Sequence, residues 1–318
     1  MPTTYAGEYL PWYATGWDAA AEAWIREQVH AAGLRLTGPI EEVRRWCLAC
    51  VLRAPTDAGA VFFKEAVRPP VFADEPRFTA ALAELYPDFL PQVIAVDAPR
   101  SWLLTMDCGA GADQDNLDLL TRYAPLQRRA VDDVDALRGA GCLARPCQDL
   151  PAQYLAVLDD GKTMSLLPDG APGRLANLAA PIADACARLA AYAIPDTLTH
   201  GDLSEGNCGM RDGRHVFFDW TDACVTHPFM DGMLVYGMDQ GEPKRRAIDA
   251  MIQPWTACEP IARLRDAWGI AELVACAHTF VTYHSITAHL PHSAQHEHVD
   301  GFRDMSSILL ETAGRHSL

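Results

Sequence analysis

The sequence contains very little lysine and asparagine. Arginine supplies most of its 26 basic residues. Lysine and asparagine occur at three positions each: Lys64, Lys162, Lys244, Asn116, Asn177 and Asn207. Because arginine serves here as the general positive charge, a lysine or asparagine in an apolar or glycine-rich setting indicates a specific chemical role.

The chain also has fewer basic than acidic residues. The chain has 26 basic and 42 acidic residues, a formal net charge of −16 and a pI of about 5.0. Binding to duplex DNA or to an anionic membrane surface needs a basic stripe. We therefore expect neither nucleic acid nor membrane as a partner, whereas a cationic ligand is compatible with this charge.

Long hydrophobic runs and a basic, apolar leader are absent, and the ten cysteines are scattered over 318 residues. Cys186 and Cys276 fall on apolar faces of expected helices, where a reduced cysteine acts as a small hydrophobic residue. Cys47 and Cys50 form one CxxC pair with no second pair nearby, which argues against a zinc or redox site. These features predict a cytoplasmic protein with free thiols.

Hydrophobic residues make up 49% of the chain and charged residues 21%, as in ordinary globular proteins. Apolar spacing predicts a helix over 17–36, a hairpin with a four-residue loop over about 40–68, and a helix over 74–86. Short strands are expected over 91–96 and 101–107. The first third of the chain is therefore rich in strands.

A segment rich in glycine and aspartate, 108–116, then breaks the pattern. The chain beyond it is expected to be mainly helical, with helices over about 116–138, 151–158 and 172–193 and tiny strands over 207–211 and 215–220. We predict an α+β protein whose smaller, strand-rich lobe, 1–107, joins a larger helical lobe, 108–318. The cleft between them is the expected site.

Three polar residues in the second lobe point to chemistry. Asp202 and Asn207 lie five apart on a loop with two glycines, and Asp219 ends an apolar strand. Oxygen donors such as Asn207 and Asp219 suit Mg²⁺, while Asp202, free of the metal, can orient an attacking hydroxyl and take its proton. A surface turn would explain the loop with Asp202 and Asn207 alone, and a salt bridge would explain Asp219 alone. Neither explains why all three residues occur together at this spacing.

The pattern H-G-D-x-x-x-x-N over 200–207, followed by an apolar strand ending in Asp219-Trp220, resembles the aminoglycoside phosphotransferase-like family, which has the bilobal protein-kinase-like fold. The resemblance implies an ATP-dependent phosphotransferase acting on a hydroxyl of a small molecule. It also implies that Asp202 is the catalytic base, that Asn207 and Asp219 hold Mg²⁺, and that His200 supports the loop.

The same resemblance implies residues in the first lobe. Lys64, within the apolar strand VFFKEAV, matches the lysine that binds the ATP phosphates. Glu75, in the first turn of the next helix, matches its glutamate partner, with Glu84 as the competitor.

The connector after the last strand of the first lobe, Met106, Asp107 and Cys108, would line the adenine site through its backbone. Asp231 matches an aspartate expected to tie down the catalytic loop.

The sequence departs from protein kinases in two ways. It has no G-x-G-x-x-G loop, and the corresponding turn reads Arg44-Arg45-Trp46-Cys47. The gap from Asp219 to His227 is too short for an activation segment, and no Ala-Pro-Glu follows. Both departures favour a small-molecule kinase.

The acceptor is expected between the catalytic loop and the helices after 228, with Asp222, Glu205, Tyr283 and His284 as candidate contacts. Acidic groups near the cleft favour a cationic acceptor, an aminoglycoside or another amino-containing compound, with a neutral sugar or alcohol as the alternative. A catalytically silent nucleotide-binding regulator is the competing class.

Histidines gather near the C-terminus and could be mistaken for a metal site: His278, His284, His289, His292, His296 and His298. Because Pro291 and polar residues surround His292 and His296, a loop is expected there. For the cluster as a whole, substrate contacts or a plain surface position are expected in place of a metal site.

Overall fold

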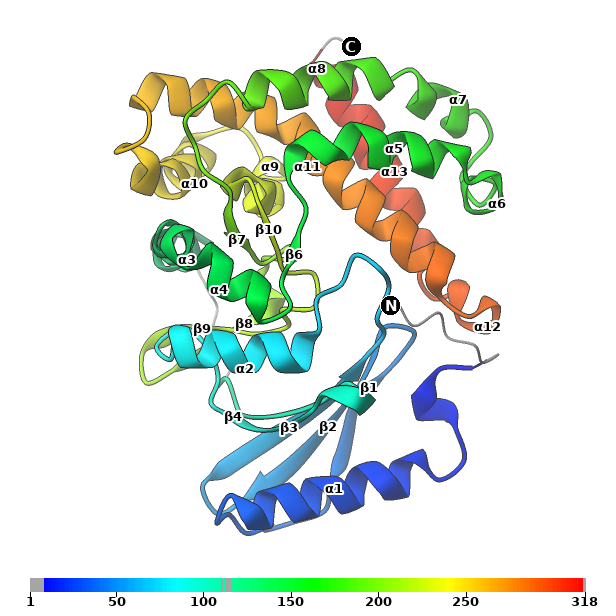
Figure 1. The fold of residues 1–318 in the computed structure, drawn as a ribbon, viewed down its shortest axis with the longest axis vertical. Helices are drawn as coiled ribbons and strands as arrows, with labels where there is room; N and C mark the ends of the chain where they lie inside the picture. Colours follow the sequence, from blue (N-terminus) through cyan, green and yellow to red (C-terminus); the bar gives the residue numbers. More distant parts are fainter. Residues whose placement is uncertain (1–8, 110, 112–115, 317–318) are drawn as a thin grey trace.

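The structure, a computed structural model, describes residues 9–109, 111 and 116–316. Its first part is built on a five-stranded antiparallel sheet (Figure 1). The strand order is β1-β2-β3-β5-β4, with β1 Glu41–Arg45, β2 Ala49–Thr56, β3 Gly59–Ala66, β5 Trp102–Met106 and β4 Val93–Asp97. The alternating apolar residues of β2 and β3 explain why one face of this sheet is buried.

Helix α1 (Trp17–Ala31) covers one face of the sheet, and α2 (Glu75–Leu85) lies between the sheet and the helical part (Figure 1). Phe63 of β3 contacts Trp17, Trp24 and Trp102 edge-to-face, with ring centroids 5.3–6.0 Å apart. This aromatic cluster fixes α1 to the sheet.

The rest of the chain is mainly helical. Its longest helix, α11, packs against both α8 and α13. The helices are α3 Asn116–Ala130, α4 Val134–Gly139, α5 Leu150–Asp159, α6 Gly161–Met164, α7 Ala171–Ala176, α8 Ala179–Leu189, α9 Met233–Tyr236, α10 Glu242–Ile252, α11 Ile261–His289, α12 His292–Gln295 and α13 Val299–Arg315. Short 3-10 turns include Pro11–Tyr13, Glu205–Asn207 and Pro228–Gly232.

Two small sheets carry the loops of the helical part. One has the order β6-β10-β7 and the other pairs β8 with β9. The bounds are β6 Leu143–Ala144, β7 Thr197–Thr199, β8 Cys208–Arg211, β9 Arg214–Phe217 and β10 Cys224–Thr226. The α+β, two-part architecture expected from the sequence is confirmed.

The two hydrophobic cores cross the division of the chain at 107/108. Phe78, Leu82 and Tyr86 of α2 belong to the core of the helical part. Conversely, Ile286 and Leu290, at the end of α11, pack in the core of the five-stranded sheet. The two parts are therefore joined by packing on both sides of the cleft, in addition to the connector.

Several predicted bounds need correction. The region 172–193 contains two helices, α7 and α8, instead of one, and α3 ends at Ala130 before a 3-10 turn. The hairpin loop has two residues, not four, because Thr56 and Gly59 already pair across it. His292 begins the short helix α12, where a loop was expected.

Burial confirms some expectations and corrects others. Cys186 and Cys276 are buried on their helices, and all ten cysteines are free. His278 and His298 are buried as well, so they are not surface residues as one alternative held. Within the described ranges, no three His, Cys, Asp or Glu side chains are arranged to hold a metal, and no helix is both long and apolar enough to cross a membrane.

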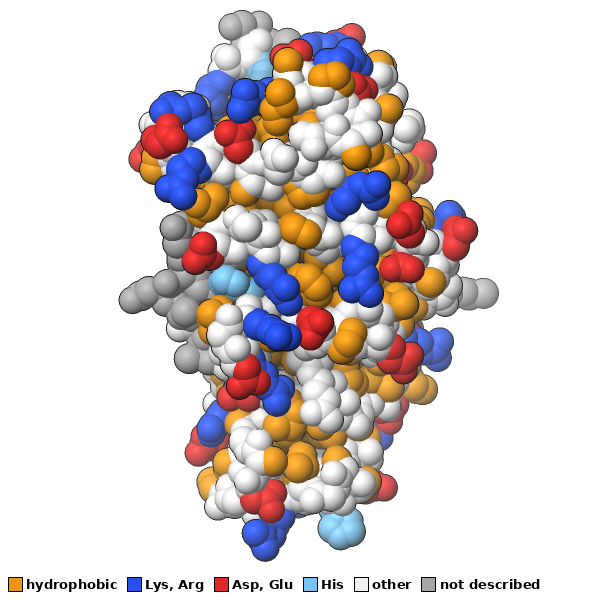
Figure 2. Space-filling view, turned by 90° about the vertical axis from the view of Figure 1, so that its left-hand side faces the viewer, with side chains coloured by type: hydrophobic (Ala, Val, Ile, Leu, Met, Phe, Trp, Pro, Cys, Tyr) orange, Lys and Arg blue, Asp and Glu red, His pale blue; other side chains and the backbone are white. Residues whose placement is uncertain are grey.

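Basic side chains gather at the waist of one face, despite the net charge of −16 (Figure 2). Two arginines of α3 lie over aromatic rings: the guanidinium of Arg122 is 3.8 Å from the ring centre of Phe89, and that of Arg129 is 4.9 Å from Tyr86. These arginines cover the contact of α3 with the α2 region, so packing accounts for their position.

The buried imidazole of His298 predicts how stability depends on pH. Burial lowers its pKa to about 4 in the folded chain, against about 6.5 when unfolded. The unfolded chain therefore binds a proton between these values, and stability falls as pH drops through that window. His298→Gln removes this component, so the advantage of the wild type over the variant should shrink by about 2 kcal/mol from about pH 7.5 to about pH 5. Urea unfolding at both pH values measures it.

The matched control is His30→Gln on the exposed side of α1. Its difference from the wild type should not change with pH. A pH-independent difference for His298→Gln would contradict the burial argument.

Candidate active site

Lys64 joins the sheet to the rest of the site. Its ammonium Nζ donates to Glu75 Oε1 at 2.8 Å, to Asp219 Oδ1 at 2.6 Å and to Thr221 Oγ1 at 2.8 Å. Glu75 begins α2, and its carboxyl group is almost completely buried. The structure thus pairs Lys64 with Glu75, while Glu84 is exposed on the far part of the same helix.

The charges of this group depend on one another. Burial alone would lower the pKa of Lys64, but the carboxylates of Asp219 and Glu75 outweigh it and raise that pKa above its usual value. Burial likewise would raise the pKa of Asp219, yet Lys64 holds it below the usual range. The ammonium and the Asp219 carboxylate therefore keep each other charged.

Residues 200–202 form a loop held from below by Asp231. The carboxylate of Asp231 accepts from the backbone N–H groups of His200 at 2.9 Å and Gly201 at 2.8 Å. It also accepts from the Tyr123 hydroxyl at 2.6 Å and from the Gln127 amide at 3.0 Å. Four donors thus converge on one buried carboxylate, which fixes the loop from which Asp202 projects.

Gly201 is needed at its position. Its φ is +82°, and a Cβ there would lie 2.4 Å from the carbonyl oxygen of Asp222. The close approach of these two backbones brings the 200–202 loop against the segment that follows Asp219.

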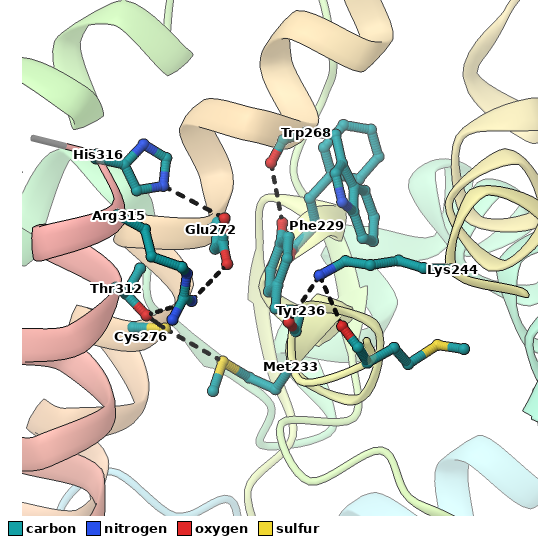
Figure 3. A network of polar contacts seen from close by, with 11 residues as sticks. Phe229, Met233, Tyr236, Lys244, Trp268, Glu272, Cys276, Thr312, Arg315 and His316 are labelled. Atoms are coloured by element: carbon teal, nitrogen blue, oxygen red, sulfur yellow. Dashed lines mark hydrogen bonds and ion pairs between the residues drawn. The ribbon is translucent and has the colours of Figure 1, made fainter. Parts of the chain in front are cut away.

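The segment carrying Asp231 is anchored by buried polar contacts (Figure 3). Lys244 of α10 donates to the carbonyl oxygens of Tyr236 at 2.9 Å and Met238 at 3.1 Å, which caps the C-terminal end of α9. The Tyr236 hydroxyl lies 3.3 Å from the carbonyl oxygens of both Phe229 and Trp268. The 3-10 turn that presents Asp231 is therefore tied to α10 and α11.

Phe218 links the loop to the end of the apolar strand. Its N–H donates to the carbonyl of Asn207 at 3.0 Å, and its carbonyl lies 2.9 Å from Nε2 of His200. The His200 ring also packs on Trp220, with ring centres 4.5 Å apart. His200 thus buttresses the loop, and Asp219, which follows Phe218, is held beside Asn207.

The donor set at this point fits a magnesium ion. Asn207 Nδ2 donates to the carbonyl and carboxylate oxygens of Asp202, both at 2.8 Å, so the amide oxygen of Asn207 points elsewhere. Lys64 and Thr221 contact only Oδ1 of Asp219, which leaves Oδ2 available. Asp219 has a φ of +62°, a conformation that is uncommon outside glycine and concentrated at functional sites.

The connector residues begin at the end of β5, an interior strand of the sheet. Met106 ends β5, and the N–H of Asp107 is used by the carbonyl of Ala60 at 3.0 Å. The Asp107 carboxylate accepts from the N–H of Gly109 at 2.9 Å. The carbonyl of Cys108 lies close to Gly209, where an added Cβ would be 2.3 Å from it, and none of the three connector residues lines the cavity described below.

A cavity of about 510 Å³ joins these groups to the helical part. It has the size expected of a small-molecule site. Its lining includes Lys64, Asp202, Asp219, Asp222, Tyr283, Trp46, Met230, Met233, Met305 and Ile308. Of the expected acceptor contacts, Asp222 and Tyr283 line the cavity. Glu205 does not, and His284 instead pairs with Asp160 at 3.0 Å.

Asp222 is a carboxyl group among other carboxylates. Burial, together with the charges of Asp202 and Asp219, raises its pKa well above the usual value. The buried Arg145 opposes this shift, and donates to Thr282 at 2.9 Å. A cationic group bound beside Asp222 would stabilise its ionised form.

Sequence reasoning did not single out Tyr123, Gln127, Thr221 or Arg145. Tyr123 and Gln127 lie on one face of α3, and Arg145 follows the short strand β6. Only Thr221, two residues after Asp219, lay within the motif region. The others are brought in by tertiary packing, for which local spacing gives no signal.

The sequence model of the phosphotransferase enzyme family matches residues 51–273, and the chain belongs to this family. No curated protein sequence matches significantly. The structure is similar to a choline/ethanolamine kinase family protein from Mesorhizobium loti, with 17% identity, a TM-score of 0.62, and coverage of 92% of this chain and 95% of that one.

It is also similar to a macrolide 2'-phosphotransferase from Brachybacterium faecium, with 16% identity, a TM-score of 0.59, and coverage of 90% and 97%. A GDP and kanamycin complex of APH(2")-IIIa shows 12% identity, a TM-score of 0.60, and coverage of 94% and 99%. The fold is that of the kinase-like phosphotransferases. The protein is accordingly a small-molecule kinase that uses a nucleotide and has a hydroxyl group as acceptor.

Because four donors converge on the Asp231 carboxylate, we expect a conservative substitution there to lower stability strongly. Asp231→Asn replaces one acceptor oxygen by an NH₂ group that faces other donors. It should destabilise the fold by roughly 2–4 kcal/mol. Tyr123→Phe removes the hydroxyl that donates to Asp231 and accepts from the N–H of His200. That N–H keeps its bond to Asp231, so the substitution should cost only about 1 kcal/mol. Urea unfolding of both variants measures the difference, and equal effects would contradict the central role of the carboxylate.

Proposed function

We propose that this kinase transfers the γ-phosphoryl group of ATP, bound with Mg²⁺, to a hydroxyl of an amino-containing small molecule. The main support for this proposal is one continuous cavity lined by Lys64, Asp202 and Asp219. These three side chains have distinct roles in the proposal. Lys64 binds phosphate oxygens, Asp202 receives the acceptor hydroxyl, and Asp219 holds the metal.

Asp202 is suited to act on the acceptor because it is exposed in the cavity and its orientation is fixed. Asn207 holds its carboxylate by a hydrogen bond of 2.8 Å, and the neighbouring Gly201 is fixed to Asp231. The carboxylate would orient the hydroxyl oxygen toward the phosphorus and accept its proton as the new bond forms. Positioning of this kind is the main contribution of a protein to phosphoryl transfer.

Asn207 and Asp219 are the proposed ligands of Mg²⁺, which when bound neutralises charge on the transferred phosphate. One oxygen of each remains available, as described above. Binding would require Asp219 to share its carboxylate between the metal and Lys64. Glu75 keeps Lys64 in place during this exchange, because its own contact with Nζ does not involve Asp219.

The nucleotide base is proposed to lie against the connector, with Met106 and Asp107 shaping the site and Cys108 offering its backbone. Lys64 sits two strands away from the sheet edge formed by β4, on the strand next to β5. This arrangement would set the base beyond the end of β5 and the phosphates over β3, the middle strand.

The acceptor is proposed to bear an amine and an apolar portion. Glu297 and Asp222 line the cavity, and an ammonium group bound there would favour the ionised form of Asp222, whose pKa is otherwise raised. Methionine and isoleucine side chains from the 3-10 turn Pro228–Gly232, from α9 and from α13 form an apolar wall. Tyr283 of α11 adds an amphipathic surface between them. A neutral sugar would add no positive charge beside the Asp222 carboxyl.

Removal of the base should affect chemistry more than binding. Asp202→Ala is expected to lower kcat by about 10²–10⁴-fold and to leave nucleotide affinity nearly unchanged. Kinetics with the true acceptor and calorimetric titration with MgATP separate the two quantities. The control, Asp184→Ala, removes an exposed carboxylate of α8 and should behave as wild type. Normal turnover by Asp202→Ala would refute the assignment.

Acceptor charge can be tested by salt. With an amine-bearing acceptor held by cleft carboxylates, KM should rise with ionic strength, because exposed charges are screened over about 8–10 Å at physiological salt. Asp222→Asn should weaken this dependence. A screen over amino-containing and neutral hydroxyl compounds, read by nucleotide consumption, supplies the acceptor. A neutral preferred acceptor with a salt-independent KM would refute the cationic class.

A further inference from the structure

The turn between β1 and β2 stands where a glycine-rich loop would cover the phosphates in a protein kinase. The sequence placed it at Arg44 to Cys47, but Arg44 and Arg45 end β1 and the turn is Trp46 to Leu48, which contains no glycine. It is held rigidly on two sides. Trp12 Nε1 donates to the carbonyl of Trp46 at 3.0 Å, and the N–H of Cys47 donates to Glu297 at 2.9 Å. The N–H of Trp46 also bonds the carbonyl of Ala49 at 3.1 Å, so the N–H groups of both Trp46 and Cys47 are occupied. Nearby side chains are therefore the better candidates for phosphate contact.

Arg44 and Arg45, the two arginines that end β1 next to this turn, differ in their partners. Arg45 contacts Asp18, Glu42 and the carbonyl of Trp12, so its guanidinium serves the structure. Arg44 is exposed and lines the central cavity. Its guanidinium stacks on Trp46 at 3.8 Å, and no carboxylate among the described residues lies within ion-pair distance of it.

Strand register places Arg44 on the same face of the sheet as Lys64. Arg44 pairs with Val51 across β1 and β2, and Val51 pairs with Lys64 across β2 and β3. Residues directly opposite each other in a sheet project from the same face. All three line the cavity. Two strand spacings separate the backbones of the two cations by about 10 Å, and their long side chains can converge on one polyphosphate.

We propose that Arg44 is a phosphate ligand of the bound nucleotide, acting with Lys64 in place of a glycine-rich loop. This inference rests on the proposed function. Lys64 would bind one phosphate group of the polyphosphate. The Arg44 guanidinium would donate two parallel N–H bonds to another phosphate group. The stacking on Trp46 restricts the Arg44 side chain, which reduces the entropy that it loses on binding.

The test compares ligands that differ only in phosphate number. Calorimetric titrations of the full chain with ATP, ADP and AMP, each with Mg²⁺, and with adenosine would be made on wild type, Arg44→Ala and Arg44→Lys. For Arg44→Ala we expect ATP affinity to fall by about 10- to 100-fold, ADP affinity to fall less, and adenosine affinity to stay within about twofold. Arg44→Lys keeps the charge without the planar fork and should lose less than Arg44→Ala.

The matched control is Arg35→Ala. Arg35 is a highly exposed arginine that contacts Asp57 in the β2–β3 turn, at the opposite end of β2. Its affinities should equal those of the wild type, and circular dichroism verifies that all variants are folded.

The possible results distinguish a failure of the role of Arg44 from a failure of the proposed function. If the wild type binds ATP but Arg44→Ala leaves its affinity unchanged, or weakens ATP and adenosine equally, the role of Arg44 is overturned and the proposed function stands. If Arg44→Ala changes only the KM of the acceptor, Arg44 belongs to the acceptor wall instead. If the wild type binds none of the four ligands, both the proposed function and the role of Arg44 fall.

Discussion

The charge of Lys64 is the constraint on which the site depends. An ammonium group whose side chain is only 16% exposed must be compensated by carboxylates, and here they come from two different places. Glu75 belongs to α2, which packs into the helical core, and Asp219 follows the hairpin of β8 and β9. Satisfying this one charge therefore fixes the sheet, α2 and the loop after Asp219 relative to one another.

A second buried carboxylate, Asp231, holds the 200–202 loop in place by hydrogen bonds, as Glu75 holds the ammonium group of Lys64. Backbone N–H groups in a tight loop have no ladder or helix to pair with, so a buried carboxylate that accepts from both is an efficient solution. The loop can approach the segment after Asp219 only because residue 201 lacks a Cβ. Asp202 is thus positioned by groups that never touch a substrate.

Much of this was accessible from the sequence. The strand and helix order, the two-part α+β layout and the choice of Glu75 over Glu84 followed from periodicity and from the start of a helix lying next to the strand it follows. The break between α7 and α8 was missed, because Asn177 and Leu178 interrupt the helix without glycine or proline to mark it. His284 was misjudged for another reason: its partner, Asp160, lies 124 residues away, and no local pattern records that contact.

Positive and negative side chains line opposite walls of the cavity. Cations project from the sheet, where Arg44 and Lys64 share a face, whereas carboxylates, Asp202, Asp222 and Glu297, project from the helical part. A polyphosphate would be drawn to the first wall and an amine to the second, so the two ligands would be sorted before either makes a specific contact. Asp219 stands between the walls, paired with Lys64 on one side and raising the pKa of Asp222 on the other. Of the two cations, Lys64 is already paired with Glu75 and Asp219, whereas Arg44 has no carboxylate within ion-pair distance among the described residues, so Arg44 is the cation whose charge is left for a ligand.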